Sequence, residues 1–244
     1  MDKNKNIIQK SITSYWDKLA DKYDTYIRRG ILTYDEKINW YKTLLELLSD
    51  QPLKILDAGY GTGNMSILLS QLGHKVTGID LSIKSLSIAK NKAFKLSNKP
   101  KFIYADATNP PFRENSFDVI FSRYLLWTLT EPDKAFSAWN RVLKPLGKLI
   151  IIDGLWKRRR SKTEKLSDDE INMEKIFICL PLYLTSNNKN LEKIRGAVKR
   201  GGFKYIRFKK IEKIDRIHQQ FYPSLKSHYV LIANKPSKIN STGL

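Results

Sequence analysis

The sequence predicts a doubly wound α/β fold, and three observations support this prediction. Short apolar runs typical of buried strands alternate along the chain with apolar residues at helical spacing. A turn containing Gly59, Gly61 and Gly63 joins one such strand, 54–58, to a helix. The next strand ends on the acidic residue Asp80. Strands and helices that alternate in this way build a mostly parallel sheet with helices on both faces.

The glycine turn indicates a nucleotide-like ligand. Glycine adopts positive φ readily and has no Cβ, so a ligand can approach the backbone closely. The helix that follows directs free N–H groups and the positive end of its dipole toward that ligand. Asp80 lies 21 residues after Gly59, about the spacing at which a carboxylate accepts hydrogen bonds from ribose hydroxyls. The pattern G-x-G-x-G departs from the dinucleotide fingerprint, which favours a mononucleoside over a nicotinamide dinucleotide.

Two helices are expected before the first strand. The segment 7–28 includes a helical stretch at 14–24 with aromatic residues, and 34–48 has apolar residues on one helical face. Gln51-Pro52 breaks the second helix. The aromatic residues of the first helix either cover a ligand as a lid or only fasten a loose terminus to the core.

The middle of the chain continues the alternation of helices and strands. Ser82 is a plausible N-cap, and Pro132 suits the first turn of a helix. The expected elements are a helix at 64–70, a strand at 74–80, a helix at 81–96, strands at 101–105 and 117–122, a helix at 132–143 and a strand at 148–153.

The last part of the chain predicts a helix at 190–200, ended by Gly201-Gly202, and strands at 203–209 and 227–233. Before it, residues 155–187 are expected to form a cap, with acids at 168–170 starting a helix and apolar residues up to Leu180. The tail 235–244 is expected to be disordered.

Composition limits the classes of function. The 244 residues contain no apolar run long enough to span a membrane, the N-terminus lacks a secretory signal, and Cys179 is the single cysteine. A cytoplasmic protein without a metal site is therefore expected. The net charge is +20, and residues 155–244 hold 21 basic and 8 acidic side chains. This excess fits either an RNA or anionic-membrane partner or a generally lysine-rich composition.

The motifs resemble those of class I S-adenosylmethionine-dependent methyltransferases of the small-molecule type, the methyltransferase domain 11 group. Asp57-Ala-Gly-Tyr-Gly-Thr-Gly63 and Gly78-Ile-Asp80 are similar to the first two motifs of that family. Arg141-Val-Leu-Lys-Pro-Leu-Gly147 resembles a later turn, with Leu146 in place of a glycine. The resemblance extends over residues 14–153. It implies a Rossmann-like methyltransferase fold with seven strands, the last antiparallel, and an inserted helical cap.

The resemblance also implies which residues bind the cofactor, S-adenosylmethionine, and its product, S-adenosylhomocysteine. Asp80 would bind the ribose, Asp106 and the following backbone N–H the adenine, and the N-terminal aromatics would form the lid. The implied cofactor-binding residues are Tyr15, Tyr23, Gly59, Tyr60, Gly61, Asp80, Leu81, Asp106, Ala107 and Ser122.

Asn109-Pro-Pro-Phe112 has two interpretations. Alone, it matches the motif with which some DNA and protein methyltransferases hold an amino group. That motif follows the fourth strand, whereas this one precedes it, so a simple turn between strands is the favoured interpretation.

The reaction implied is an in-line transfer of a methyl group, for which alignment can supply much of the rate. Arg123 and Tyr124 follow the fourth strand and are weak candidates for catalysis, as is His218 between the last two strands. Trp127, His74 and His228 are interpreted as structural. The methyl acceptor and the oligomeric state cannot be read from the sequence.

The predicted organisation is therefore N-terminal helices and lid (1–50), a cofactor-binding core (51–154), a cap (155–187), the last helix and strands (188–234) and a tail (235–244). The leading hypothesis is a methyltransferase with a small-molecule acceptor. The alternatives are a methyltransferase of RNA or membrane lipid that uses the basic C-terminal third, and a non-catalytic S-adenosylmethionine-binding protein.

Overall fold

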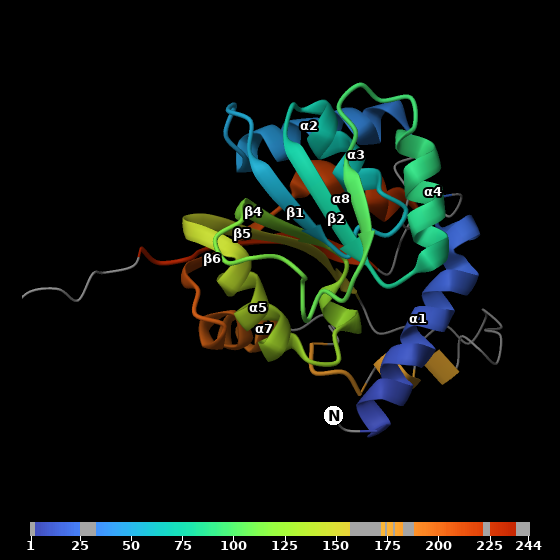
Figure 1. Ribbon diagram of the computed structural model, residues 1–244, viewed down its shortest axis with the longest axis vertical. Coiled ribbons are helices and arrows are strands. Elements are labelled where there is room, and N and C mark those ends of the chain that lie inside the picture. The colour runs from blue at the N-terminus through green and yellow to red at the C-terminus, as the bar shows by residue number, and fades with distance from the viewer. Residues whose placement is uncertain are drawn as a thin grey trace, which may run out of the picture.

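The computed structural model describes residues 3–24, 33–156, 172–173, 175–177, 179–182, 188–221 and 225–237. Its centre is one seven-stranded sheet in the order β3-β2-β1-β4-β5-β7-β6 (Figure 1). The strands are β1 (Lys54–Ala58), β2 (Lys75–Asp80), β3 (Lys101–Tyr104), β4 (Phe117–Arg123), β5 (Leu143–Trp156), β6 (Lys204–Lys210) and β7 (Leu225–Asn234). The helices are α1 (Lys3–Tyr23), α2 (Tyr34–Leu47), α3 (Asn64–Gln71), α4 (Ile83–Ala93), α5 (Pro132–Val142), α7 (Asn188–Arg200) and α8 (Glu212–Phe221), with a 3-10 turn at Leu126–Thr128.

The first five strands run parallel, and β7 runs antiparallel to both of its neighbours, β5 and β6. The predicted doubly wound, mostly parallel seven-stranded sheet with an antiparallel last strand is therefore confirmed. Strand order reverses between β1 and β4, which is where open α/β sheets bind ligands beyond the carboxyl ends of their strands.

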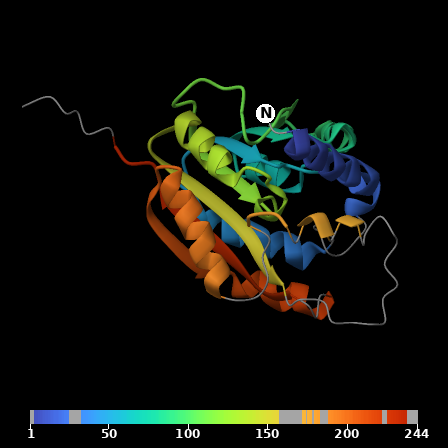
Figure 2. The ribbon, with the colours of Figure 1, turned by 90° about the horizontal axis from the view of Figure 1, so that it is seen from below.

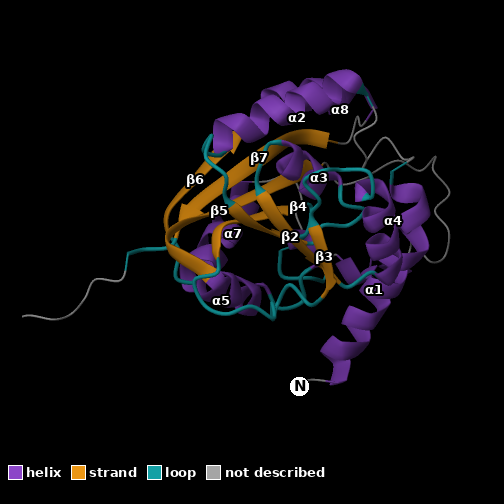
Figure 3. Cartoon of the chain, turned by 45° about the horizontal axis from the view of Figure 1, so that its top comes forward, coloured by secondary structure: helices purple, strands orange, loops and turns teal. Residues whose placement is uncertain are grey.

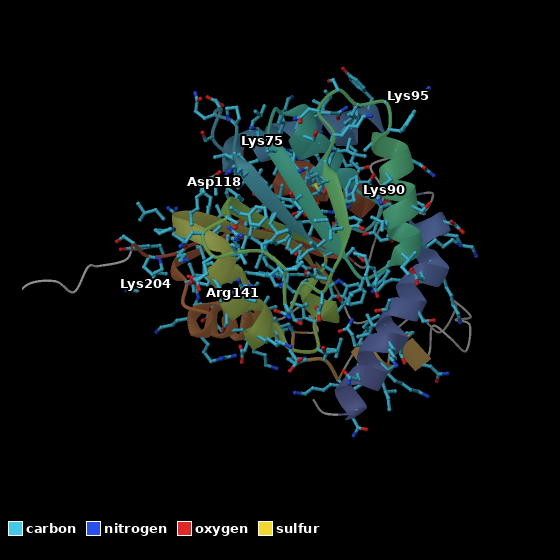
Figure 4. All side chains as sticks on the ribbon, viewed as in Figure 1. Lys75, Lys90, Lys95, Asp118, Arg141 and Lys204 are labelled. Carbon is cyan, nitrogen blue, oxygen red and sulfur yellow. The ribbon has the colours of Figure 1, made fainter. Side chains whose placement is uncertain are left out.

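Two apolar layers cover the sheet. Trp40 and Leu44 of α2 pack on one face together with α3 and α8, and Phe136 and Trp139 of α5 pack on the other with α7. Figure 3 shows α2 and α8 along one face and α5 and α7 on the opposite one. The amino ends of the strands are polar, since Asp118 accepts hydrogen bonds from the Lys54 amide at 2.8 Å and Lys144 Nζ at 2.6 Å. Figure 4 shows Asp118 and Lys75 at this edge, away from α1.

Helix α1 crosses the opposite edge, at the carboxyl ends of the strands. Ile12 is buried against Met173, Phe177 and Leu180 from the described part of the expected cap. Figure 2 shows these short pieces, in orange, beside α1, in dark blue. The N-terminal helix thus contacts both the sheet's ligand-binding edge and the segment between β5 and α7.

The structure confirms two predicted helix starts and changes the bounds of one predicted strand. Ser82 caps α4 by accepting from the Ser85 amide, and Pro132 lies in the first turn of α5. The turn at Leu146 does adopt a positive φ of 63°, the conformation for which the family pattern has glycine. β5 is longer than expected because it begins at Leu143, before an irregularity in its pairing with β4.

The sequence predicts no helix between the last two strands, but the structure has α8 there, at Glu212–Phe221. Ile211, Ile214 and His218 are buried along one side of this region. The first helix is also longer than expected, since α1 begins at Lys3.

Several predictions fall outside the described residues: the helix started by the acids at 168–170, the end of the segment 7–28 at 25–28, and the tail from residue 238. In the described part of the chain, no helix combines the length and apolar character that crossing a bilayer requires.

Candidate functional site

The glycine turn after β1 forms a bare backbone cradle. Gly59, Gly61 and Gly63 all have positive φ, of 77°, 55° and 85°. A Cβ at Gly59 would lie 2.9 Å from Leu125 Cδ1, and one at Gly63 would lie 2.9 Å from Ala89 Cβ. Both conformation and space therefore require glycine at these two positions.

Asp80 fixes the cradle to the end of β2. Its Oδ2 accepts from the Gly61 amide and its Oδ1 from the Ser82 amide, both at 2.9 Å. Burial raises the pKa of Asp80, and these backbone N–H groups counteract part of that rise. The carboxylate therefore has a fixed orientation beside the cradle.

A cavity lies between the cradle and α1. It encloses about 850 Å³ of empty space, part of it open to solvent. The walls come from α1, the cradle, and the segments after β2, β3 and β4. The lining residues are Gln9, Ile12, Thr13, Trp16, Tyr23, Gly59, Gly61, Ile79, Asp80, Leu81, Ser82, Ser85, Ala105, Asp106, Ala107, Thr108, Arg123, Tyr124, Leu125, Thr128 and Leu129.

Seven of the ten residues expected to bind the cofactor line this cavity. They are Tyr23, Gly59, Gly61, Asp80, Leu81, Asp106 and Ala107. Asp106 accepts from the Thr108 amide at 2.7 Å and from its hydroxyl at 2.8 Å, which holds the carboxylate at the end of β3.

The other three expected residues, Tyr15, Tyr60 and Ser122, do not line this cavity. The Tyr15 ring packs against Trp16 and Phe177, beneath the cap. Ser122 is fully buried and donates to the Ala58 carbonyl at 2.9 Å.

Tyr60, the third of these residues, lines the smaller cavity described below, and its ring packs against the core. Its ring lies 4.9 Å from that of Phe102, and a Cβ at Gly78 would be 2.7 Å from Tyr60 Cδ1. Gly78 of the second motif therefore makes room for the tyrosine of the first motif.

Two acidic residues, Asp17 in α1 and Asp24 directly after it, fasten the helix across the cavity. Asp17 accepts from the Ser82 hydroxyl at 2.5 Å, at the start of α4. Asp24 accepts from Thr62 Oγ1 at 2.6 Å and from Lys92 Nζ at 2.8 Å. Burial raises the pKa of Asp24, but the hydrogen bonds from Lys92 and Thr62 outweigh it, so the pKa lies below its usual range. The sequence motifs do not point to either acid.

A smaller cavity of about 280 Å³ adjoins the first and shares Tyr23, Gly59 and Arg123 with it. Asp57 lies on its wall and accepts from the Ser66 hydroxyl at 2.6 Å. Desolvation by burial raises the pKa of Asp57 to about 7, although the Ser66 hydrogen bond opposes it. An acidic side chain, Asp57, and a basic one, Arg123, therefore both border this cavity.

Of the three catalytic candidates, two line the cavity and one does not. Arg123 and Tyr124 belong to the wall, and the Arg123 guanidinium lies 4.6 Å over the Tyr124 ring. His218 is buried in α8, where its Nε2 is 2.8 Å from Glu36 Oε1. His218 is not among the residues that line the cavity.

His228, interpreted as structural, is connected to the cavity wall. Its Nε2 makes a hydrogen bond with the Tyr124 hydroxyl, and its Nδ1 lies 2.7 Å from Asp215 Oδ1. No local signal in the sequence points to this contact, because 104 positions separate the two residues.

The remaining local predictions agree with the structure. The carbonyls of Pro110 and Phe112 accept from Arg141, which confirms the segment as a turn. Trp127 packs against Trp16 and Phe177, and His74 Nδ1 accepts from the Leu53 amide. Both residues have the structural roles expected of them. Among the described residues, no group of three or more histidines, cysteines or acids is arranged to hold a metal ion.

Residues 56–151 match the family model described as a methyltransferase domain. These residues are therefore similar to methyltransferase domains, and the match covers less than half of the chain. This region contains the cradle, Asp80, Asp106 and Tyr124. It agrees with the resemblance named from the motifs.

The demethylmenaquinone methyltransferase of Thermotoga maritima is 32% identical to this chain over 154 residues. The alignment covers 62% of this chain and 65% of that enzyme, so the chain spans a little less than two thirds of the relative's length.

Two solved structures share the fold of the methyltransferase domain. The phosphoethanolamine N-methyltransferase 2 of Haemonchus contortus, in complex with phosphomonomethylethanolamine and S-adenosylhomocysteine, has a TM-score of 0.65 at 23% identity, covering 92% of this chain and 58% of that one. The [4+2]-cyclase SpnF has a TM-score of 0.65 at 19% identity, covering 93% and 95%. None of the three proteins is named for an RNA, so the RNA alternative gains no support from their names.

Proposed function

We propose that this protein transfers a methyl group from S-adenosylmethionine to a small-molecule acceptor. The observation that carries the proposal is the cavity in which the glycine cradle, Asp80 and Asp106 meet beneath α1. Relatives named for demethylmenaquinone and phosphoethanolamine support a small acceptor. The fold alone is not sufficient support, because one neighbour with the same fold is named as a cyclase.

The residues present fit an adenosine-bearing cofactor. The Asp80 carboxylate uses one oxygen for each of two backbone N–H groups, and each oxygen retains acceptor capacity for a ribose hydroxyl. Asp106 and the Ala107 backbone at the end of β3 would hold the adenine. Asp57 and Arg123 of the smaller cavity suit the oppositely charged groups of an amino-acid end.

When bound, S-adenosylmethionine supplies a methyl group already activated by the sulfonium. The protein then has to align the acceptor with it and exclude water. Helix α1 would serve as the lid, since Trp16 and Tyr23 line the cavity and Asp17 and Asp24 fasten the helix to the cradle side. Tyr15, Tyr60 and Ser122 would then support the site from behind.

Binding and transfer can be tested separately. Calorimetry with S-adenosylmethionine and S-adenosylhomocysteine should show saturable binding of both, and the absence of heat and of thermal stabilisation with either would refute the proposal. A screen of a metabolite extract with a methyl-labelled donor should then yield a labelled small product. Binding without transfer to any compound would instead favour the non-catalytic alternative.

A further inference from the structure

Beyond the cofactor cavity, the structure contains a buried polar chain that begins at the cavity wall. The Tyr124 hydroxyl contacts His228 Nε2, and His228 Nδ1 lies 2.7 Å from Asp215 Oδ1. The side chains come from the end of β4, from β7 and from α8. His228 is 0% exposed and Asp215 6% exposed, so the chain is sealed from solvent beyond Tyr124.

The contacts of Asp215 fix the direction of the hydrogen bonds. Its Oδ1 accepts from the His228 backbone amide at 2.6 Å and lies 2.7 Å from Nδ1 of the same residue. A carboxylate in this position accepts a hydrogen bond from Nδ1–H, so the neutral ring carries its proton on Nδ1 and its lone pair on Nε2. Tyr124 must then donate its hydroxyl proton to His228, and the phenolic oxygen keeps its own lone pairs for another donor.

The backbone of Tyr124 is held in an unusual conformation. Its φ is 59°, in the left-handed region that bulky residues rarely adopt. Its amide donates to the Ile152 carbonyl at 3.0 Å. Strain of this kind persists where the surroundings fix it and is frequent at functional sites. Here it accompanies a tyrosine that lines the cavity while its hydroxyl contacts β7.

A second buried pair supports the helix that carries Asp215. His218 Nε2 lies 2.8 Å from Glu36 Oε1, which joins α8 to α2. The His218 ring packs against the His228 ring at 4.9 Å. Glu36 and His218 are therefore positioning residues, because they act through α8 and do not line the cavity.

We infer that Tyr124, His228 and Asp215 form a proton relay that deprotonates the methyl acceptor. The acceptor's hydroxyl gives its proton to Tyr124 Oη as Tyr124 passes its own proton to His228 Nε2. The resulting imidazolium is paired with Asp215. The acceptor's oxygen forms its bond to the methyl carbon while the carbon–sulfur bond breaks and its electron pair returns to sulfur. This inference rests on the proposed function.

The relay indicates the class of acceptor. Methyl transfer to an atom that is already a free nucleophile needs no base, whereas a weakly acidic hydroxyl must lose its proton as the new bond forms. A buried relay at the wall of the cavity is therefore suited to an acceptor that reacts through a hydroxyl group.

The charges around the relay are consistent with a neutral imidazole in the resting protein. Burial lowers the pKa of His228, and His218 and Arg123 lower it further, while Asp215 raises it. For Tyr124, burial raises the pKa of the phenol above its usual range, and the Arg123 charge opposes that rise. Glu36 and Asp153 also face this group and favour the neutral phenol.

The tautomer of His228 tests the inference without any substrate. The chain has three histidines, so nitrogen NMR of protein labelled with ¹⁵N-histidine resolves them, and His228→Gln assigns the signal. We expect Nδ1 protonated and Nε2 unprotonated. Tyr124→Phe should shift the Nε2 resonance of His228 and leave that of His74 unchanged. A protonated Nε2 in the resting protein would overturn the relay, because His228 could not then receive the proton of Tyr124.

Kinetics with a simple phenol panel, catechol and hydroquinone included, provide the second test. For any phenol that is methylated, Tyr124→Phe should lower kcat by about 100-fold or more, and the loss should shrink as the pH approaches the pKa of the phenol. The matched control is Tyr229→Phe, next to His228 on β7 but packed on the opposite, α5 side of the sheet. Equal kcat for Tyr124→Phe and the unaltered protein would refute the relay. If the unaltered protein did not bind S-adenosylhomocysteine, that result would instead count against the proposed function.

Discussion

The two halves of the sheet build their parts of the site in different ways. On the side of β1, β2 and β3, the site includes a stretch of bare backbone: three glycines with positive φ and two amides fixed by Asp80. On the side of β4, β5 and β7, it is made of side chains, with Tyr124 at the wall and His228 and Asp215 behind it. The first half presents a fixed shape, and the second presents groups that can exchange protons.

This difference matches the two partners of the proposed reaction. A cofactor that is the same in every turnover can be held by backbone groups, which are rigid and cost little to preorganise. An acceptor has to be selected and activated, which requires the pKa values that only buried side chains provide. The following predictions test the contrast, beginning with the largest expected effect.

Removing the charge of Asp80 should weaken cofactor binding on the β1, β2 and β3 side of the sheet. We expect Asp80→Asn to weaken S-adenosylhomocysteine binding by about 100-fold, since hydrogen bonds to charged groups contribute about 1.5–3 kcal/mol each. Calorimetry measures the change, and circular dichroism verifies the fold. The matched control, Asp118→Asn, removes a carboxylate at the other edge of the sheet. It should lower stability and leave affinity intact, and similar affinities for the two variants would argue against ribose recognition by Asp80.

Releasing α1 should have a smaller effect, because the helix closes the cavity but does not form its floor. For the double variant Asp17→Ala/Asp24→Ala we expect the dissociation rate of S-adenosylhomocysteine to rise by about tenfold, equivalent to about 1.4 kcal/mol. Stopped-flow fluorescence of the α1 tryptophan can follow release. Asp21→Ala is the control on the same helix, since Asp21 pairs only with exposed Lys84 among the contacts of the described residues. An unchanged rate in the double variant would remove the lid role.

The pH dependence of the free energy of unfolding tests the burial of Asp153, on the β4, β5 and β7 side of the sheet. Burial raises its pKa to about 7, and the Gly154 amide and Arg123 only partly offset this. Between the unfolded pKa near 3.8 and the folded value, the folded chain keeps a proton that the unfolded chain has lost. Stability therefore falls as the pH rises through this window, and the loss is complete above it.

Asp153→Asn removes this penalty. We expect little change in the free energy of unfolding at pH 4 and a gain of about 1–3 kcal/mol at pH 8, from the equivalence of about 1.4 kcal/mol per pKa unit. Urea unfolding at both values measures it. The exposed, ion-paired Asp133 provides the control Asp133→Asn, which should show no such pH dependence. An equal gain at pH 4 and pH 8 would show that burial of a charge at Asp153 is not the cause.

The sequence predicted the backbone half well, because its signals are local. Glycines 59, 61 and 63 and Asp80 lie within 22 consecutive residues of the chain, and their conformations follow from residue type and spacing. α8 was missed because its buried side includes His218 and Asp215, polar residues that do not register as an apolar face. The packing of the Tyr60 ring over Gly78 could not be predicted, because it depends on the contact between β2 and the cradle.

The sequence by itself determined the succession of strands and helices along the chain except for α8, and also the glycine cradle and the acid beside it, since each depends on neighbours in the chain. Only the tertiary structure decided that Tyr124, His228 and Asp215 meet, and that Asp17 and Asp24 fasten α1 across the cavity. The physical reason is that the insertion of β7 beside β5 brings distant segments together in a space from which water is excluded. Hydrogen bonds between their side chains form there, and no spacing along the chain encodes them.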